Sequence, residues 1–201
     1  MLLCVDLPEA HARLAAGELT CASANCDAAL RPWGYAQPRR IRVDAATTEC
    51  YTPRRARCRG CGRTHVLSSA RALPHRPDTA AVVGQALLAA STGLGYRQVA
   101  LQVERPETTV RGWLRRAYLN ANEIWSAATR RALVLDPMAD PFNPGGHPLL
   151  GPVGALGQAI AAHVRRFGPV ADPWSIAVVV SGGRLLAPPA PSASPRPPNS
   201  S

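Results

Sequence analysis

The sequence predicts an α+β protein in which a small strand-rich unit precedes an all-helical one. Residues 20–72 are rich in cysteine, arginine and turn formers, and Pro38 and Pro53 separate short runs typical of strands. Residues 73–131 instead carry apolar side chains at helical spacing. The other expected segments are a lead-in at 1–19, a small and poorly defined C-terminal region at 132–186, and a Pro/Ser-rich tail at 187–201 whose composition predicts disorder.

The charge of the chain points to a polyanion partner. All 23 basic residues are arginines, and with 13 acidic residues the formal net charge is +10. Eleven of the arginines lie between Arg31 and Arg76, against only Asp44 and Glu49. Arginine binds phosphate and guanine edges through two hydrogen bonds, so this clustering favours a nucleic acid. A solvated basic surface is the alternative.

The apolar segments predict no membrane span and a cytoplasmic, nucleoid-associated protein. Met1–Leu19 lacks the basic start and the apolar run of a signal peptide. The longest apolar run, Trp174–Val180, is far shorter than the ~18 residues that cross a bilayer. Structural disulfides are rare in that compartment, so the six cysteines favour metal ligands or free thiols.

Within the strand-rich unit, two cysteine pairs flank a segment that resembles a hairpin. Strands are expected around 30–36, 39–43, 54–57 and 64–67, after one cysteine pair and on both sides of the other. Four residues separate Cys21 from Cys26, and two separate Cys58 from Cys61, where Gly62 permits a tight turn. Two such pairs predict a zinc ribbon with a closed tetrahedral site of four thiolates.

The predicted zinc is structural, with one ion per chain. About 50 residues with few large apolar side chains make a small core, and metal binding supplies the missing free energy of folding. His65 is the reserve ligand, Cys50 a weaker one, and Cys4 lies outside the pattern. A redox pair needs a strand–helix context that the arginine-rich segment lacks, and a disulfide needs an oxidising compartment.

The helical unit predicts a helix-turn-helix. Asp78 is the expected N-cap of a helix over 79–90, followed by a short helix over 96–103. Pro106 begins a third helix that runs to about residue 125. A short helix, a tight turn and a longer helix are the elements of this DNA-binding motif, although an ordinary helical hairpin has the same pattern.

The outward positions of this motif are the predicted DNA contacts. The start of the third helix would read base edges, its next turn would contact phosphates, and the second helix would hold the DNA backbone. The residues are Arg97, Gln98, Glu107, Thr108, Thr109, Arg111, Arg115 and Arg116.

The C-terminal region gives little sign of catalysis. A helix is expected over 149–167 and a short apolar run over 175–180. A carboxylate-dependent recombinase needs several converging acids on a substantial sheet, and this region offers only Asp136, Asp140 and Asp172. No nucleophile elbow, P-loop or zinc-protease motif is present. The sequence therefore predicts a binding protein and not an enzyme.

The segments "RRARCRGCGRTHVL" and "GYRQVALQVERPETTVRGWLRRA" resemble the zinc-ribbon and helix-turn-helix front end of insertion-sequence transposases. They resemble more closely small stand-alone proteins of high-G+C Gram-positive bacteria with the same pairing. The resemblance covers about residues 20–125, and it implies zinc on Cys21, Cys26, Cys58 and Cys61 and DNA on the helix from Pro106.

The expected function is sequence-specific binding of double-stranded DNA, as a mobile-element accessory or a transcriptional regulator. The chain would act as a homodimer or beside a separate transposase subunit. Two alternatives stay open: an inactive or partial transposase or recombinase, and an RNA- or protein-binding adaptor built on the ribbon.

Overall fold

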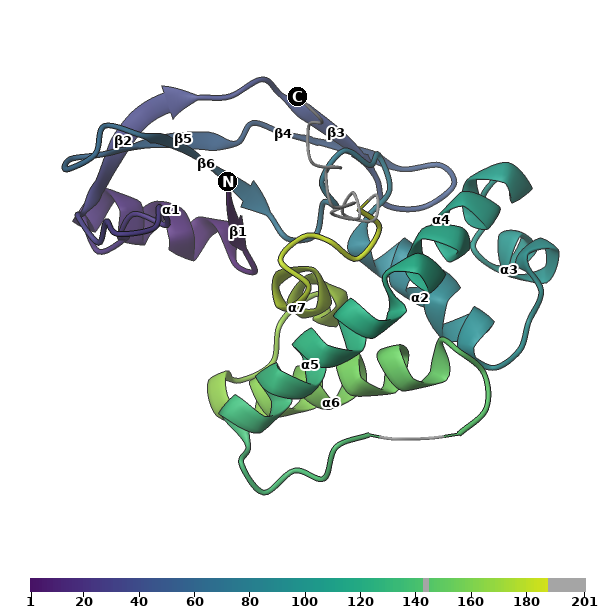
Figure 1. Cartoon of the computed structure of the whole chain (residues 1–201). Helices are drawn as coiled ribbons and strands as arrows, with labels where there is room; N and C mark the ends of the chain where they lie inside the picture. The colour runs from purple at the N-terminus through teal and green to yellow at the C-terminus, as the bar shows by residue number, and fades with distance from the viewer. Residues whose placement is uncertain (143–144, 188–201) are drawn as a thin grey trace, which may run out of the picture.

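The computed structural model describes residues 1–142 and 145–187, so the predicted tail lies outside the described residues except for Ala187. Seven helices and a small set of N-terminal strands make up the described part, which confirms the prediction of a mixed α+β protein. Figure 1 shows the four-stranded sheet with α1 at one end of the molecule, helices α2–α7 gathered at the other, and β3 and β4 extending toward the helices.

The strands form two sheets close to the expected positions. A four-stranded sheet has the order β1-β6-β5-β2, with β1 parallel to β6 and the other pairs antiparallel. A two-stranded antiparallel ribbon pairs β3 with β4. The sequence analysis did not anticipate β1 or β4. The bounds are β1 Leu2–Cys4, β2 Leu30–Tyr35, β3 Arg39–Arg42, β4 Thr48–Tyr51, β5 Arg54–Cys58 and β6 Thr64–Ser69.

Helix α1 (Leu7–Ala16) covers one face of the four-stranded sheet. Its N-cap is Asp6, whose carboxylate accepts a hydrogen bond of 2.8 Å from the backbone N–H of Glu9. On its inner face Leu14 is fully buried, and it packs in one apolar cluster with Leu30 and Leu67. The segment expected as a lead-in thus supplies an edge strand and half of this small core.

The other six helices share a single apolar core, to which side chains such as Val83, Trp113 and Leu156 contribute. The C-terminal region, expected to be poorly defined, supplies two of these helices. Its short apolar run is helical and lies in α7. The bounds are α2 Ala80–Ser91, α3 Tyr96–Gln102, α4 Glu107–Leu119, α5 Ala121–Leu135, α6 Leu150–Phe167 and α7 Pro173–Val180.

The long helix expected from Pro106 to about residue 125 is wrong, because the chain divides into two helices at Asn120. The buried amide of Asn120 donates hydrogen bonds to the carbonyl oxygens of Arg184 at 3.2 Å and Ala187 at 2.9 Å. These bonds connect the junction of α4 and α5 with the segment after α7. The contact spans more than 60 residues of sequence, so local periodicity carries no sign of it.

Helices α2 and α7 approach closely at Gly84. A Cβ built on this glycine would lie 1.9 Å from the ring of Trp174. Only a residue without a side chain leaves room for the indole, which fixes how α7 lies on α2.

A buried carboxylate joins the strands to the helices. Thr79 is the N-cap of α2, so the prediction that Asp78 has this role is wrong. Asp78 is 1% exposed and pairs with Arg105 Nε at 2.7 Å and Arg42 Nη2 at 2.9 Å. Arg105, whose side chain is 3% exposed, also donates to the carbonyl oxygen of Asp44 at 3.0 Å. The network links β3, the start of α2 and the turn between α3 and α4.

No helix in residues 1–142 or 145–187 combines the length and apolar character needed to span a membrane.

We predict that Asp78→Asn lowers the free energy of unfolding by about 3–5 kcal/mol, because it leaves the guanidinium of Arg105 buried without its counter-charge. Chemical denaturation of the wild type and the variant measures this loss. Glu49→Gln is the matched control, since it removes a carboxylate from the half-exposed pair with Arg71 and should change stability by less than ~1 kcal/mol. Equal losses in the two variants would contradict the role assigned to Asp78.

Candidate metal centre

Four cysteine sulfur atoms meet at the end of the four-stranded sheet next to α1. Cys21 and Cys26 come from the segment between α1 and β2, Cys58 ends β5, and Cys61 lies in the turn before β6. All four Sγ atoms lie within 4.8 Å of one another. The Sγ–Sγ distance is 3.5 Å for Cys26 and Cys58, and 3.7 Å for Cys21 and Cys61.

The spacing of these sulfur atoms fits a single four-coordinate metal ion. With metal–sulfur bonds of about 2.3 Å, a tetrahedron places its sulfur atoms about 3.8 Å apart. The two shortest distances are close to that value. In the described ranges no other set of three or more His, Cys, Asp or Glu side chains gathers in this way. The cluster could therefore bind a metal ion through four thiolates.

The backbone around the sulfur atoms is shaped for close approach. The N–H of Cys61 donates to Sγ of Cys58, and the N–H of Ser23 donates to Sγ of Cys21, each at 3.4 Å. A Cβ on Gly60 would lie 2.9 Å from Cβ of Ala28 and 3.6 Å from Sγ of Cys26. This glycine lets the turn between the second pair of cysteines pass directly beside the first pair.

The thiols of the cluster differ in acidity. Hydrogen bonds from Ser23 are the main cause that lowers the pKa of Cys21 to about 7. Burial alone would raise the pKa of Cys58, but backbone N–H groups of Cys61 and Gly60 lower it to about 6. At Cys26 the backbone at Ala28 lowers the pKa, yet the neighbouring Cys58 sulfur and burial outweigh it and raise the value to about 11. A metal ion would displace the proton held there, since a bound thiol is a thiolate.

The remaining cysteines and the reserve ligand lie outside the group of four. His65 is buried on β6 with Nε2 3.2 Å from Sγ of Cys21, so its ring supports that sulfur. Cys50 is exposed on β4. Cys4 is half-buried on β1, and burial raises the pKa of its thiol to about 11.

The residues predicted to contact DNA lie on α3 and the first turns of α4. Thr108, Arg111 and Arg115 are exposed, and their spacing of three and four residues aligns them along one stripe of α4. Glu107 and Arg97 are also exposed and pair with each other at 3.6 Å.

Two further predicted contacts have hydrogen-bond partners within the chain, and a third is partly buried. Gln98 accepts a hydrogen bond from the N–H of Gly95, which closes the start of α3. Thr109 is only half-exposed. The guanidinium of Arg116 donates to the carbonyl oxygen of Gly112 at 3.1 Å.

One group of exposed side chains was not singled out from the sequence. On β2, the ring of Trp33 is flanked by the guanidinium carbons of Arg31 at 5.1 Å and Arg57 at 4.7 Å. The alternation of Arg31 and Trp33 along a strand, with an arginine on the neighbouring strand, was the available signal.

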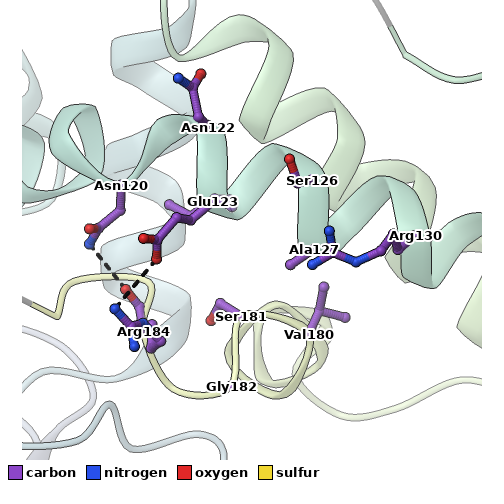
Figure 2. Close-up of a pocket in the computed structure, with 11 residues that line it drawn as sticks. Asn120, Asn122, Glu123, Ser126, Ala127, Arg130, Val180, Ser181, Gly182 and Arg184 are labelled. Atoms are coloured by element: carbon purple, nitrogen blue, oxygen red, sulfur yellow. Dashed lines mark hydrogen bonds and ion pairs between the residues drawn. The ribbon is translucent and has the colours of Figure 1, made fainter. Parts of the chain in front are cut away.

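A hollow of about 650 Å³ lies between α5 and the segment after α7 (Figure 2). Its single carboxylate, that of Glu123, pairs with Arg184 at 3.5 Å. The side-chain amide of Asn120 already donates to backbone carbonyl oxygens. Asp136 pairs with Arg165 at 2.8 Å, and Asp172 caps the start of α7. These acids are held by separate structural contacts.

Comparisons of the chain with protein-family models, curated proteins and solved structures found no match.

We predict that Cys61→Ser loses the bound metal and unfolds the sheet and α1, because three thiolates leave the ion incompletely coordinated. Native mass spectrometry would count the metal, and circular dichroism would follow the fold. Cys50→Ser, at an exposed cysteine outside the cluster, should keep both. A folded Cys61→Ser protein with unchanged metal content would contradict the assignment.

Metal affinity should fall as the pH is lowered. Binding requires deprotonated sulfur atoms, and the raised pKa of Cys26 means that its proton must leave at neutral pH. Each proton displaced weakens the apparent affinity about tenfold per pH unit. Competition with a chromophoric chelator between pH 6 and 8 measures the slope, and an affinity independent of pH would count against thiolate ligation.

Proposed function

We propose that this chain is a sequence-specific binder of double-stranded DNA, with α3 and α4 as a helix-turn-helix and residues 20–72 as a zinc ribbon. The observation that carries the proposal is the stripe of Thr108, Arg111 and Arg115 on α4. Threonine and arginine at the start of a second helix are suited to base edges in the major groove.

The geometry around the turn supports this reading. The inner faces of α3 and α4 pack against the helical core through the buried side chains of Val99, Val110 and Trp113. Arg105, between the helices, is fixed by Asp78, so the start of α4 has a defined position. A reading helix needs such support because small displacements break paired hydrogen bonds to bases.

Charge supports a polyanion ligand at the same helix. Among the described residues, neither Arg111 nor Arg115 has a carboxylate oxygen within 4.0 Å. Arg111, whose guanidinium carbon lies 6.0 Å from the centroid of the Tyr96 ring, would contact a base edge, and Arg115, one turn later, would contact a phosphate. Arg115 suits that role better than Arg116, whose guanidinium is already bonded to Gly112.

Zinc is the metal we propose for the cysteine cluster, in a structural role. Four thiolates at tetrahedral spacing suit zinc or an iron–sulfur centre, and paired cysteine turns with N–H groups directed at sulfur suit a single ion. With all four positions taken by the chain, no coordination position remains for substrate.

In this proposal the protein recognises the ends of a mobile element or regulates transcription, and it catalyses no reaction. The resemblance of residues 20–125 to transposase front ends favours the mobile-element role. The separate contacts of Asp136 and Asp172 support a binding role over a carboxylate-dependent one.

In vitro selection from random duplex DNA with the zinc-loaded full chain should enrich one motif. Arg111→Ala should weaken binding to that motif by about 1–3 kcal/mol, or about 5- to 150-fold, and relax the preference at one position. Arg166→Ala removes an exposed arginine from the end of α6 and should leave both unchanged. Binding without enrichment of any sequence would refute sequence-specific recognition.

Affinity for the selected duplex should fall steeply with salt, because arginine–phosphate contacts release counterions. Arg115→Ala should weaken binding to all duplex sequences alike and reduce the slope of log K against log [salt] by about 1. Titrations at several salt concentrations measure the slope, and a salt-insensitive interaction would contradict the proposed contacts.

A further inference from the structure

The face of the four-stranded sheet opposite α1 carries an arginine cluster around an exposed tryptophan. Leu30, Ala56 and Cys58 turn inward to the core under α1. Arg31 and Arg57 are paired across β2 and β5 in the sheet register, so their side chains share the outer face. The guanidinium carbons of both arginines lie within 5.1 Å of the ring centroid of Trp33, which is 41% exposed.

This cluster lacks internal charge compensation. Among the described residues, Arg31, Arg57 and Arg59 have no carboxylate oxygen within 4.0 Å. Like charges directly opposite each other on neighbouring strands repel, and the electron-rich face of Trp33 offsets only part of that repulsion. A bound anion would compensate the remaining repulsion between the arginines. The cluster is therefore suited to bind an anion.

A hollow of about 470 Å³ lies beside the two arginines that contact Trp33. Arg31, Arg57, Arg59, Cys58, Gly60 and Gly62 line it. It is within the range of small-ligand sites, so it has room for a nucleotide unit. Part of its wall comes from the turn between Cys58 and Cys61, so a metal ion bound by these cysteines would also shape the hollow.

We propose that this outer face binds single-stranded DNA. The arginines contact the phosphates, and Trp33 stacks on an unpaired base. An exposed aromatic ring among arginines is suited to a strand whose bases are free, because a base inside a duplex has no open face. The choice of DNA over RNA rests on the proposed function, in which the chain holds a DNA duplex elsewhere.

The site is separate from the stripe on α4. Figure 1 shows β2 and β5 at one end of the molecule and α3 and α4 at the other. The chain would thus hold a duplex at one end and an unpaired segment of the same DNA at the other. Each site is testable in the absence of the other.

The test is fluorescence anisotropy of a labelled 12-residue oligo(dT) with the zinc-loaded full chain. Trp33→Ala should weaken binding by about tenfold, since one stacked base contributes about 1–3 kcal/mol. Trp33→Phe keeps a ring and should recover most of the affinity. Phe167→Ala removes an exposed ring from α6 and should have no effect. Duplex binding by Trp33→Ala should match the wild type, whereas Arg111→Ala should bind the selected duplex about 5- to 150-fold more weakly and keep its affinity for oligo(dT).

A readout on the wild-type chain guards against loss of folding in the variants. An oligo(dT) that carries one 5-iodouracil should crosslink to Trp33 on irradiation, and peptide mass spectrometry locates the adduct. Three results would overturn the proposal: no binding of oligo(dT) at low salt, an unchanged affinity in a folded Trp33→Ala variant, or crosslinks elsewhere. Tighter binding of oligo(U) than of oligo(dT) would reassign the face to RNA. Failure of duplex selection alone would leave these outcomes unaffected.

Discussion

The arrangement of this molecule depends on one buried carboxylate, that of Asp78. Arg105 leaves water almost completely, and a buried guanidinium is tolerated only beside an opposite charge with its donors satisfied. Asp78 supplies that charge, while carbonyl oxygens of Asp44 and Glu104 accept from the remaining donors. Because Arg105 stands between α3 and α4, and Arg42 belongs to β3, the same carboxylate sets the turn of the helix pair against the two-stranded ribbon.

In the sheet with α1, the cysteine cluster connects separate segments of the chain, as Asp78 does between the ribbon and the helices. The apolar cluster under α1 contains few large side chains, and Cys21 and Cys58 are themselves members of it. The sulfur atoms therefore join the segment before β2 to the turn after β5 where apolar packing is thin. A metal ion bound at this point would hold the edge of the sheet beside the turn, and with it the arginines of β2 and β5. One face of the sheet packs against the core under α1, and the other faces solvent.

Much of the fold follows from local patterns, and the exceptions have physical causes. Cysteine spacing and alternating strands indicated which four sulfur atoms come together, because those signals lie within short segments. The role of Asp78 was misjudged because a short acid before a helix fits an N-cap, while its partners lie 36 and 27 residues away. The division at Asn120 likewise involves a distant contact, whereas the helix over Pro173–Val180 begins at a local signal, Asp172 as N-cap followed by a proline. The contact between Trp33 and Arg57 was not predicted, because it depends on the pairing register of β2 with β5, which the sequence does not specify locally.

Strand β2 is an outer strand of its sheet, with β5 as its only partner there among the described residues. An open strand edge is a template on which a second copy can add its own strand. Here Pro32 offers no N–H, the pairing register shifts between Pro32 and Tyr35, and Gly34 adopts a φ of 78° within that irregular stretch. These features interrupt the ladder, and the neighbouring arginines repel an identical edge. Many copies at high concentration can then stay distinct folded molecules and need not join into a continuous intermolecular sheet.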